Sequence, residues 1–106
     1  MKVSIKATNL ELTEAIKQYV EDKMNMLDKY LDDIAVMNCD FEVELTSNHH
    51  NKGNIFRAEV NLDFPKELLR VEKTEEDLYK AIDKVKDHLA EMIVKYKEKL
   101  LDKERQ

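Results

Sequence analysis

The 106-residue chain has few of the residues that most often build compact chemical sites: one cysteine, one glycine, one proline and no tryptophan. The single cysteine, Cys39, excludes an internal disulfide and any metal site made of several cysteines, which agrees with a reducing compartment. Phosphate-binding loops need several glycines because bare backbone must approach the ligand. The lone Gly53 therefore excludes Walker and dinucleotide-binding loops, and with them the commonest nucleotide-dependent enzymes.

Long apolar segments are also missing. No run approaches the roughly 18 apolar residues of a membrane helix, and residues 1–15 alternate apolar and polar side chains, unlike the continuous apolar block of a secretory signal. With 42% hydrophobic residues the chain is too apolar for a disordered tail. We therefore expect one cytoplasmic domain spanning residues 1–106, without membrane association and with a frayed tail at residues 101–106.

Apolar and polar residues alternate along several segments, which is the period of a strand with one buried face. This pattern predicts strands at residues 3–7, 36–45 and 56–64, and the inward register of the second includes Met37 and Cys39. The polar stretch 47–54 is expected to join the second and third strands. Pro65 fits a turn, because its fixed φ suits the second turn position, and a short fourth strand is expected at residues 68–72.

Apolar residues at three-and-four spacing predict two helices. The first is expected to begin after Thr13 as N-cap and to run to about Leu31. The second is expected to begin at residues 74–77, Thr-Glu-Glu-Asp, which have the form of a capping box. The order β-α-β-β-β-α predicts an α+β fold: a four-stranded mixed sheet with two helices packed on one face, its first two strands parallel and its hairpins antiparallel.

The formal net charge of −5 hides an uneven distribution. The exposed face of the predicted sheet carries more carboxylates than cations: Asp40, Glu42, Glu44, Glu59, Asp63 and Glu72 against Lys2, Lys6, Arg57 and Arg70. Projection at 3.6 residues per turn gives the second helix a basic band, interrupted by Glu91 and made of Lys80, Lys84, His88, Lys95 and Lys99. The pattern alone favours a solvated, salt-bridged helix face over nucleic-acid binding.

No residue pattern points to catalysis or to a bound metal. His49 and His50 are neighbours in a polar hairpin tip, without a paired cysteine or carboxylate at ligand spacing. His88 lacks a partnered nucleophile, and Cys39 belongs to a buried register, which predicts an inert thiol. We expect no enzyme activity, no cofactor and no small-molecule substrate.

Two apolar residues fall outside the stripes that face the predicted core. Met26 on the first helix and Val94 on the second are expected to be exposed, and exposed apolar side chains can mark a contact with another macromolecule. An alternative function is therefore a protein-interaction module with no direct RNA contact, which would use Met26 and Val94, or the open acidic face of the sheet, to bind a protein partner or a second copy of itself.

Two separated segments resemble a known family, the ribosome hibernation-promoting factors, also called ribosome-associated inhibitors or protein Y. The first resembles that family's first helix and contains residues 9–16 (NLELTEAI), 19–21 (YVE), 23–24 (KM) and 27–30 (LDKY). The second resembles its second-helix signature and contains residues 77–83 (DLYKAID) and 95–99 (KYKEK). The likeness spans nearly the whole chain, and the family's β-α-β-β-β-α fold agrees with the predicted order.

The resemblance implies a non-enzymatic cytoplasmic protein that binds the small ribosomal subunit, both RNA and proteins, at the decoding channel. There it would block messenger and transfer RNA and preserve idle ribosomes. Off the ribosome we expect a monomer. Members of this family reach ribosomal RNA largely with basic side chains on both helices. The matching positions here are Lys17, Lys23, Lys29, His88 and Lys95, with Lys80, Lys84, Lys97 and Lys99 nearby.

Two positions depart from the family pattern. Met26 stands where relatives usually have lysine, and Glu91 stands where they usually have arginine. A carboxylate facing phosphate is expected to weaken binding by repulsion and by loss of counterion release. The chain also stops at Gln106, before the additional domain that longer members use to pair two ribosomes. The sequence therefore fits a short-type factor or one domain of a longer protein.

Overall fold

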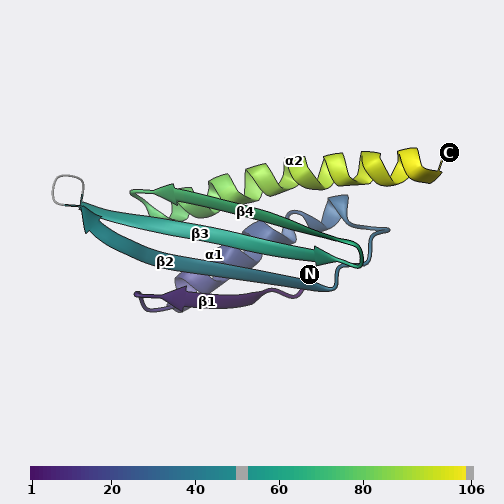
Figure 1. Ribbon diagram of the computed structural model, residues 1–106. Coiled ribbons are helices and arrows are strands. Elements are labelled where there is room, and N and C mark those ends of the chain that lie inside the picture. Colours follow the sequence, from purple (N-terminus) through teal and green to yellow (C-terminus); the bar gives the residue numbers. More distant parts are fainter. Residues whose placement is uncertain (50–52, 105–106) are drawn as a thin grey trace.

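Four strands form one sheet in the order β1-β2-β3-β4 in the computed structural model, which describes residues 1–49 and 53–104. β1 is parallel to β2, whereas β2–β3 and β3–β4 are antiparallel. Both helices lie on the same face of the sheet (Figure 1). The elements in chain order are β1 (Ser4–Thr8), α1 (Glu14–Asn25), the short 3₁₀ helix η1 (Asp28–Tyr30), β2 (Asn38–His49), β3 (Gly53–Phe64), β4 (Glu67–Glu75) and α2 (Leu78–Glu104). The predicted fold is confirmed.

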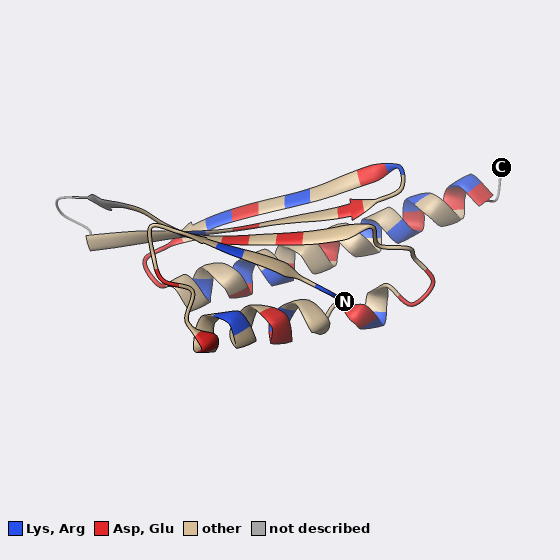
Figure 2. Ribbon diagram, turned by 90° about the horizontal axis from the view of Figure 1, so that it is seen from below, with Lys and Arg blue, Asp and Glu red and all other residues tan. Residues whose placement is uncertain are grey.

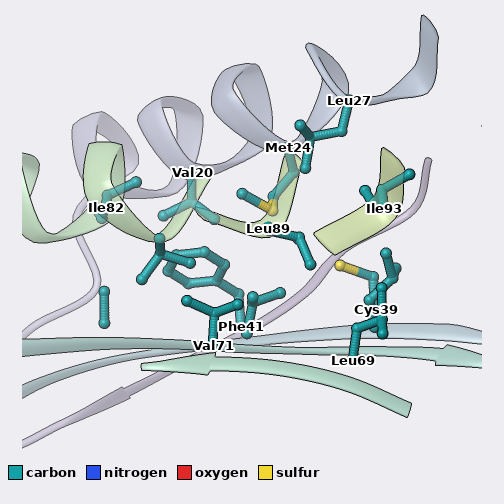
Figure 3. Packing of buried hydrophobic residues seen from close by; sticks show 14 of the residues in the cluster. Val20, Met24, Leu27, Cys39, Phe41, Leu69, Val71, Ile82, Leu89 and Ile93 are labelled. Carbon is teal, nitrogen blue, oxygen red and sulfur yellow. The ribbon is translucent and has the colours of Figure 1, made fainter. Parts of the chain in front are cut away.

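The core lies between the sheet and the two helices. One cross-strand row shows how the register builds it, since Phe41 of β2 pairs with Val60 of β3, which pairs in turn with Val71 of β4. All three are buried, and Phe41 and Val71 face Val20 of α1 and Ile82 of α2 across the layer (Figure 3). Burying a large apolar side chain contributes roughly 1.5–3 kcal/mol, so this layer is the main source of stability.

The N-terminus of α1 matches the prediction. The Ile16 N–H donates to the hydroxyl oxygen of Thr13 at 3.2 Å, which is the N-cap bond. The α-helix ends at Asn25, however, and the expectation that it continues to about Leu31 is wrong. The chain tightens into 3₁₀ bonds, such as the Leu27 N–H to the carbonyl of Met24. Since Leu27 and Leu31 stay buried, the apolar spacing continued past the end of the helix.

The capping box predicted at residues 74–77 does not form. β4 continues through Glu75, and Thr74 pairs with Arg57 in the β3–β4 ladder, so α2 begins only at Leu78. Asp77 serves as the cap instead, because its carboxylate accepts the N–H of Tyr79 at 2.9 Å. At its other end α2 includes residues 101–104, which were expected to fray.

Two further expectations concern strand ends. Met37 was predicted to face the core but is 59% exposed, because it precedes β2 and strand alternation does not fix its side chain. The polar stretch 47–54 was predicted as a loop, yet β2 reaches His49 and β3 starts at Gly53, with a register shift between Leu45 and Ser47. His50, half of the expected hairpin tip, lies outside the described residues. The turn at Pro65 is confirmed.

Candidate nucleic-acid interface

The two helices are joined by one carboxylate. Asp83 of α2 accepts a hydrogen bond from the Tyr19 hydroxyl of α1 at 2.6 Å, and the Lys23 ammonium lies 3.2 Å from the same oxygen. The Tyr19 ring meets Tyr79 edge-on with centroids 4.7 Å apart. The hydrogen bond to Asp83, together with desolvation, raises the pKa of Tyr19 to about 12, so the phenol remains a donor. Lys23 is thus already engaged within the fold.

The other predicted lysines of the first helical segment are exposed. Lys17 lies on α1, and Lys29 lies in η1 with its ammonium 5.2 Å from the centroid of the Tyr30 ring. Neither lysine is engaged in the Asp83 junction, so both can meet a polyanion without breaking it.

The basic band of α2 lies beside β4, the strand at one end of the sheet. Lys84 and His88 line a depression together with Lys73 of β4, and Lys95 and Lys99 line the next one along the helix. Two ion pairs cross from the helix to the strand. Lys84 pairs with Glu75, whose pKa it lowers through the hydrogen bond, and Lys99 lies 3.6 Å from Glu67.

The predicted residues therefore do not form one patch. Tyr79 and Asp83 mark the flank of α2 that meets α1, whereas Lys84, His88 and Lys95 mark the flank that meets β4. Lys80 is exposed near the start of α2 and Lys97 is half-buried. Figure 2 shows lysines and acidic residues interleaved along both helices. The structure thus separates an α2–β4 group from the lysines of α1 and η1.

Sequence reasoning missed Lys73. This residue shares the helix-facing register of β4 with the buried Leu69 and Val71, and it is half-buried beside the basic band. The expected fourth strand stopped at residue 72, one position short of Lys73. The signal was present, because extending the alternation by one residue places this lysine on the helix side of the sheet.

The open face of the sheet carries a second charged cluster. The Arg57 guanidinium lies 2.6 Å from both Glu42 and Glu44, 3.3 Å from Glu59 and 3.7 Å from Glu72. Hydrogen bonds from Thr8 and then from Arg57 hold the pKa of Glu42 below its usual range. These carboxylates are satisfied by an arginine of the fold itself.

Little in the described residues suggests other chemistry. Among residues 1–49 and 53–104 no group of three or more histidine, cysteine or carboxylate side chains is arranged to hold a metal ion. No helix in that part of the chain is both long and apolar enough to span a bilayer. Cys39 is 3% exposed, and burial raises the pKa of its thiol to about 12, as an unreactive thiol requires.

A family model described as "Sigma 54 modulation protein / S30EA ribosomal protein" matches residues 3–101. The chain belongs to this family. Similar family members include a ribosome hibernation promotion factor of Deinococcus radiodurans, 36% identical over 92% of this chain and 49% of that protein. Another from Lactococcus lactis is 35% identical over 99% of this chain and 54% of that protein. The chain spans about half the length of these curated relatives.

Solved structures agree with the family. The N-terminal domain of Thermus thermophilus protein Y superposes with a TM-score of 0.76 at 33% identity, covering 91% of this chain and 99% of that one. A ribosomal subunit interface protein from Coxiella burnetii gives a TM-score of 0.74 at 17% identity, over 92% of this chain and 98% of that one, which shows the shared fold. The resemblance to the hibernation-promoting factors and protein Y is confirmed.

Proposed function

We propose that this chain is a ribosome hibernation factor: it binds the small ribosomal subunit at the decoding channel, blocks messenger and transfer RNA, and so preserves idle ribosomes in the cytoplasm. The observation that carries the proposal is a basic flank on α2, Lys84, His88, Lys95 and Lys99, in a member of the family whose relatives are named ribosome hibernation promotion factors. The role requires binding and no catalytic step.

Charge explains how a protein of net charge −5 can approach RNA. Salt screens interactions beyond a Debye length of roughly 8–10 Å, so an RNA phosphate responds to the lysines beside it and little to the acidic face of the sheet. The α2 flank supplies the principal contacts in this proposal, and Lys17 and Lys29 add exposed charge on the first helical segment. Lys23 acts mainly by fixing α1 to α2 through Asp83.

A second candidate function rests on two exposed apolar side chains. Met26 is 50% exposed and Val94 is 39% exposed. Such residues favour a contact with a protein surface, and a module working only through them would associate with its partner after nuclease treatment and in moderate salt.

Co-sedimentation with vacant small subunits tests the first candidate. The double substitution Lys84→Glu/Lys95→Glu places two carboxylates in the basic flank, and we expect it to lower binding and to abolish inhibition of a cell-free translation reaction. Each lost phosphate contact is expected to lower the slope of log K against log salt by roughly 0.7–0.9. The matched control is Lys2→Glu/Lys6→Glu, which makes the same charge change on two exposed residues at β1.

The possible outcomes distinguish a wrong assignment of the binding face from a wrong assignment of the function. Unchanged binding by the α2 variant would reject the assigned face. Failure of the unmodified chain to pellet with ribosomes, in low salt as well as in moderate salt, would reject the function. Binding that persists after removal of the lysines and resists salt would favour the protein-interaction module.

A further inference from the structure

Three depressions adjoin one another along the side of α2 that faces β4. The first lies between Lys73 of β4 and residues 84–91 of α2, and the second between Leu69 of β4 and residues 92–99. The third lies between the last turns of α2, the β3–β4 turn and residues 33–35, and it shares Glu67, Tyr96 and Lys99 with the second. Together they form one groove, called here the α2–β4 groove, with α2 on one side, β4 and the turn on the other, and residues 33–35 beside its last part.

The groove is as long as the basic band on the helix, which runs from Lys80 to Lys99, and it lies about one turn nearer the C-terminus. From Lys84 to Lys103 the helix rises about 28 Å at 1.5 Å per residue, enough for several nucleotides. Figure 1 shows α2 running beside β4 and continuing past the end of the sheet. The groove follows both parts, because Lys103 lines it beyond Lys99.

Lysines outnumber carboxylates along this groove, although acidic residues outnumber basic ones in the whole chain. Six lysines and His88 line it against four carboxylates. The lysines are Lys66, Lys73, Lys84, Lys95, Lys99 and Lys103, and the carboxylates are Asp33, Glu67, Asp87 and Glu91, with a fifth, Glu75, paired to Lys84. Three of these lysines, Lys66, Lys73 and Lys103, were not among the residues assigned from the sequence.

The shape of the groove and its aromatic content indicate how a polyanion is held. The depressions between the helix and the edge strand are shallow and open to solvent, so a polynucleotide backbone can lie along them. Tyr96, the aromatic residue that lines it, is 8% exposed and stacks on Phe64 with ring centroids 4.5 Å apart. A base therefore finds no open ring there to stack on, and the lysines are left to recognise the sugar–phosphate backbone.

We propose that the α2–β4 groove holds the sugar–phosphate backbone of ribosomal RNA, with Lys66 of the β3–β4 turn and Lys73 of β4 as phosphate contacts opposite α2. This rests on the proposed ribosome binding and adds a second wall to the surface that α2 presents. Glu75 and Glu67 hold Lys84 and Lys99 across the groove in the free chain. A phosphate must compete with these two carboxylates, so they weaken binding.

The first test measures binding to purified small subunits over a series of potassium chloride concentrations. Lys66→Gln/Lys73→Gln is expected to lower affinity on the order of tenfold and to reduce the salt slope by roughly 1.4–1.8, which corresponds to two lost phosphate contacts. The control Lys2→Gln/Lys6→Gln loses the same charge outside the groove and should bind as the unmodified chain does. Urea unfolding of both variants confirms that they fold.

Neutralising the two carboxylates that pair with groove lysines, Glu67 and Glu75, is expected to raise affinity for small subunits instead of lowering it. Glu67→Gln/Glu75→Gln releases both lysines without removing a cation, and affinity is expected to rise about threefold. Glu11→Gln/Glu14→Gln neutralises two exposed carboxylates near the start of α1 and is the control for the same change in net charge. A gain equal to that of the control would overturn the competition between these carboxylates and phosphate.

Cross-linking identifies the occupant. Because Cys39 is buried, the substitution Lys73→Cys introduces a half-buried thiol, more exposed than Cys39, that can carry a photoreactive maleimide, and Lys2→Cys serves as the comparison outside the groove. Cross-links to ribosomal RNA from position 73 alone support the proposal. Cross-links to a ribosomal protein, no cross-link, or equal affinity of the two double-lysine variants would overturn it. An unmodified chain that fails to bind subunits would instead reject the proposed function itself.

Discussion

The open sheet face and the α2–β4 groove are both rich in charged residues, but their charges are satisfied in different ways. On the sheet face one guanidinium, Arg57, is shared by four carboxylates and its side chain is 15% exposed. In the groove, among the described residues, Lys84 and Lys99 each have one carboxylate partner, and Lys73 and Lys95 form no ion pair. The charges on the sheet face are therefore paired within the fold, whereas the lysines of the groove remain available to a partner.

The difference follows from the side chains that each surface uses. A guanidinium is planar and offers five N–H donors in a fixed fork, which suits several carboxylates at once. A lysine ammonium is a strongly hydrated point charge on a flexible stem and exchanges one anion for another easily. Net charge is therefore a poor guide to partners in this molecule, and the decisive property is whether a charge already has a partner.

The largest effect on stability is expected when the central cation of the charged cluster on the open sheet face is removed. Arg57→Leu leaves four carboxylates close together without their shared cation, and we expect it to lower the free energy of unfolding by about 2–3 kcal/mol at neutral pH. Urea unfolding measures the change. Arg70→Leu is the matched control, because Arg70 is 62% exposed and pairs with Glu59 alone. We expect that variant to lose less than about 1 kcal/mol. Equal losses would show that Arg57 has no special role.

An effect of intermediate size is expected on the stability of the fold at low pH. Thr8 donates to Glu42 at 2.5 Å, and this bond and Arg57 depress the pKa of that carboxyl. The stability from a depressed pKa is present above the unfolded pKa, near 4.5, and is lost as the pH falls through the lower folded value. Thr8→Val is expected to cost about 1 kcal/mol at pH 7.

Thermal unfolding of both chains between pH 7 and pH 2 measures this effect. The gap between the unmodified chain and Thr8→Val is expected to narrow below about pH 4.5, because protonated Glu42 depends less on its donors. A gap that stays constant with pH would show that Thr8 acts through packing alone.

The smallest effect is expected on affinity for small subunits, from neutralising one carboxylate in the α2–β4 groove. Glu91 is exposed and lines the groove beside His88. Glu91→Gln removes a negative charge next to the bound phosphates, and we expect it to raise affinity for small subunits about two- to threefold at low salt. The gain should vanish as salt rises, because the repulsion is screened. A decrease in affinity would show that Glu91 makes a favourable contact.

The sequence was a good guide wherever one face of an element is buried. Alternation over residues 56–64 predicted both β3 and its inward residues, since a slip by one position would turn every apolar side chain to solvent. The strand directions followed from the order of elements. The N-cap at Thr13 was also predicted, because the bond that it makes is local.

Predictions failed where distant contacts decide local structure. The capping box predicted at residues 74–77 does not form, because pairing with Arg57 in the β3–β4 ladder keeps Thr74 extended. The candidate site was predicted as two helix faces, and Lys84, His88, Lys95 and Lys99 do lie along one flank of α2. No sequence pattern shows that Asp83 draws Lys23 into the junction of the helices, or that β4 supplies Lys73 as an opposite wall.

Lys73 also has a consequence for the free protein in solution. β4 is the last strand in the sheet order, so one row of its main-chain groups faces outward with no strand partner in the part of the chain that the structure describes. Such an edge can pair with the edge of another molecule, and an inward-pointing lysine is a common obstacle to that pairing. The charge that we assign to RNA on the ribosome would therefore keep unbound copies apart, and replacing it should favour self-association at high concentration.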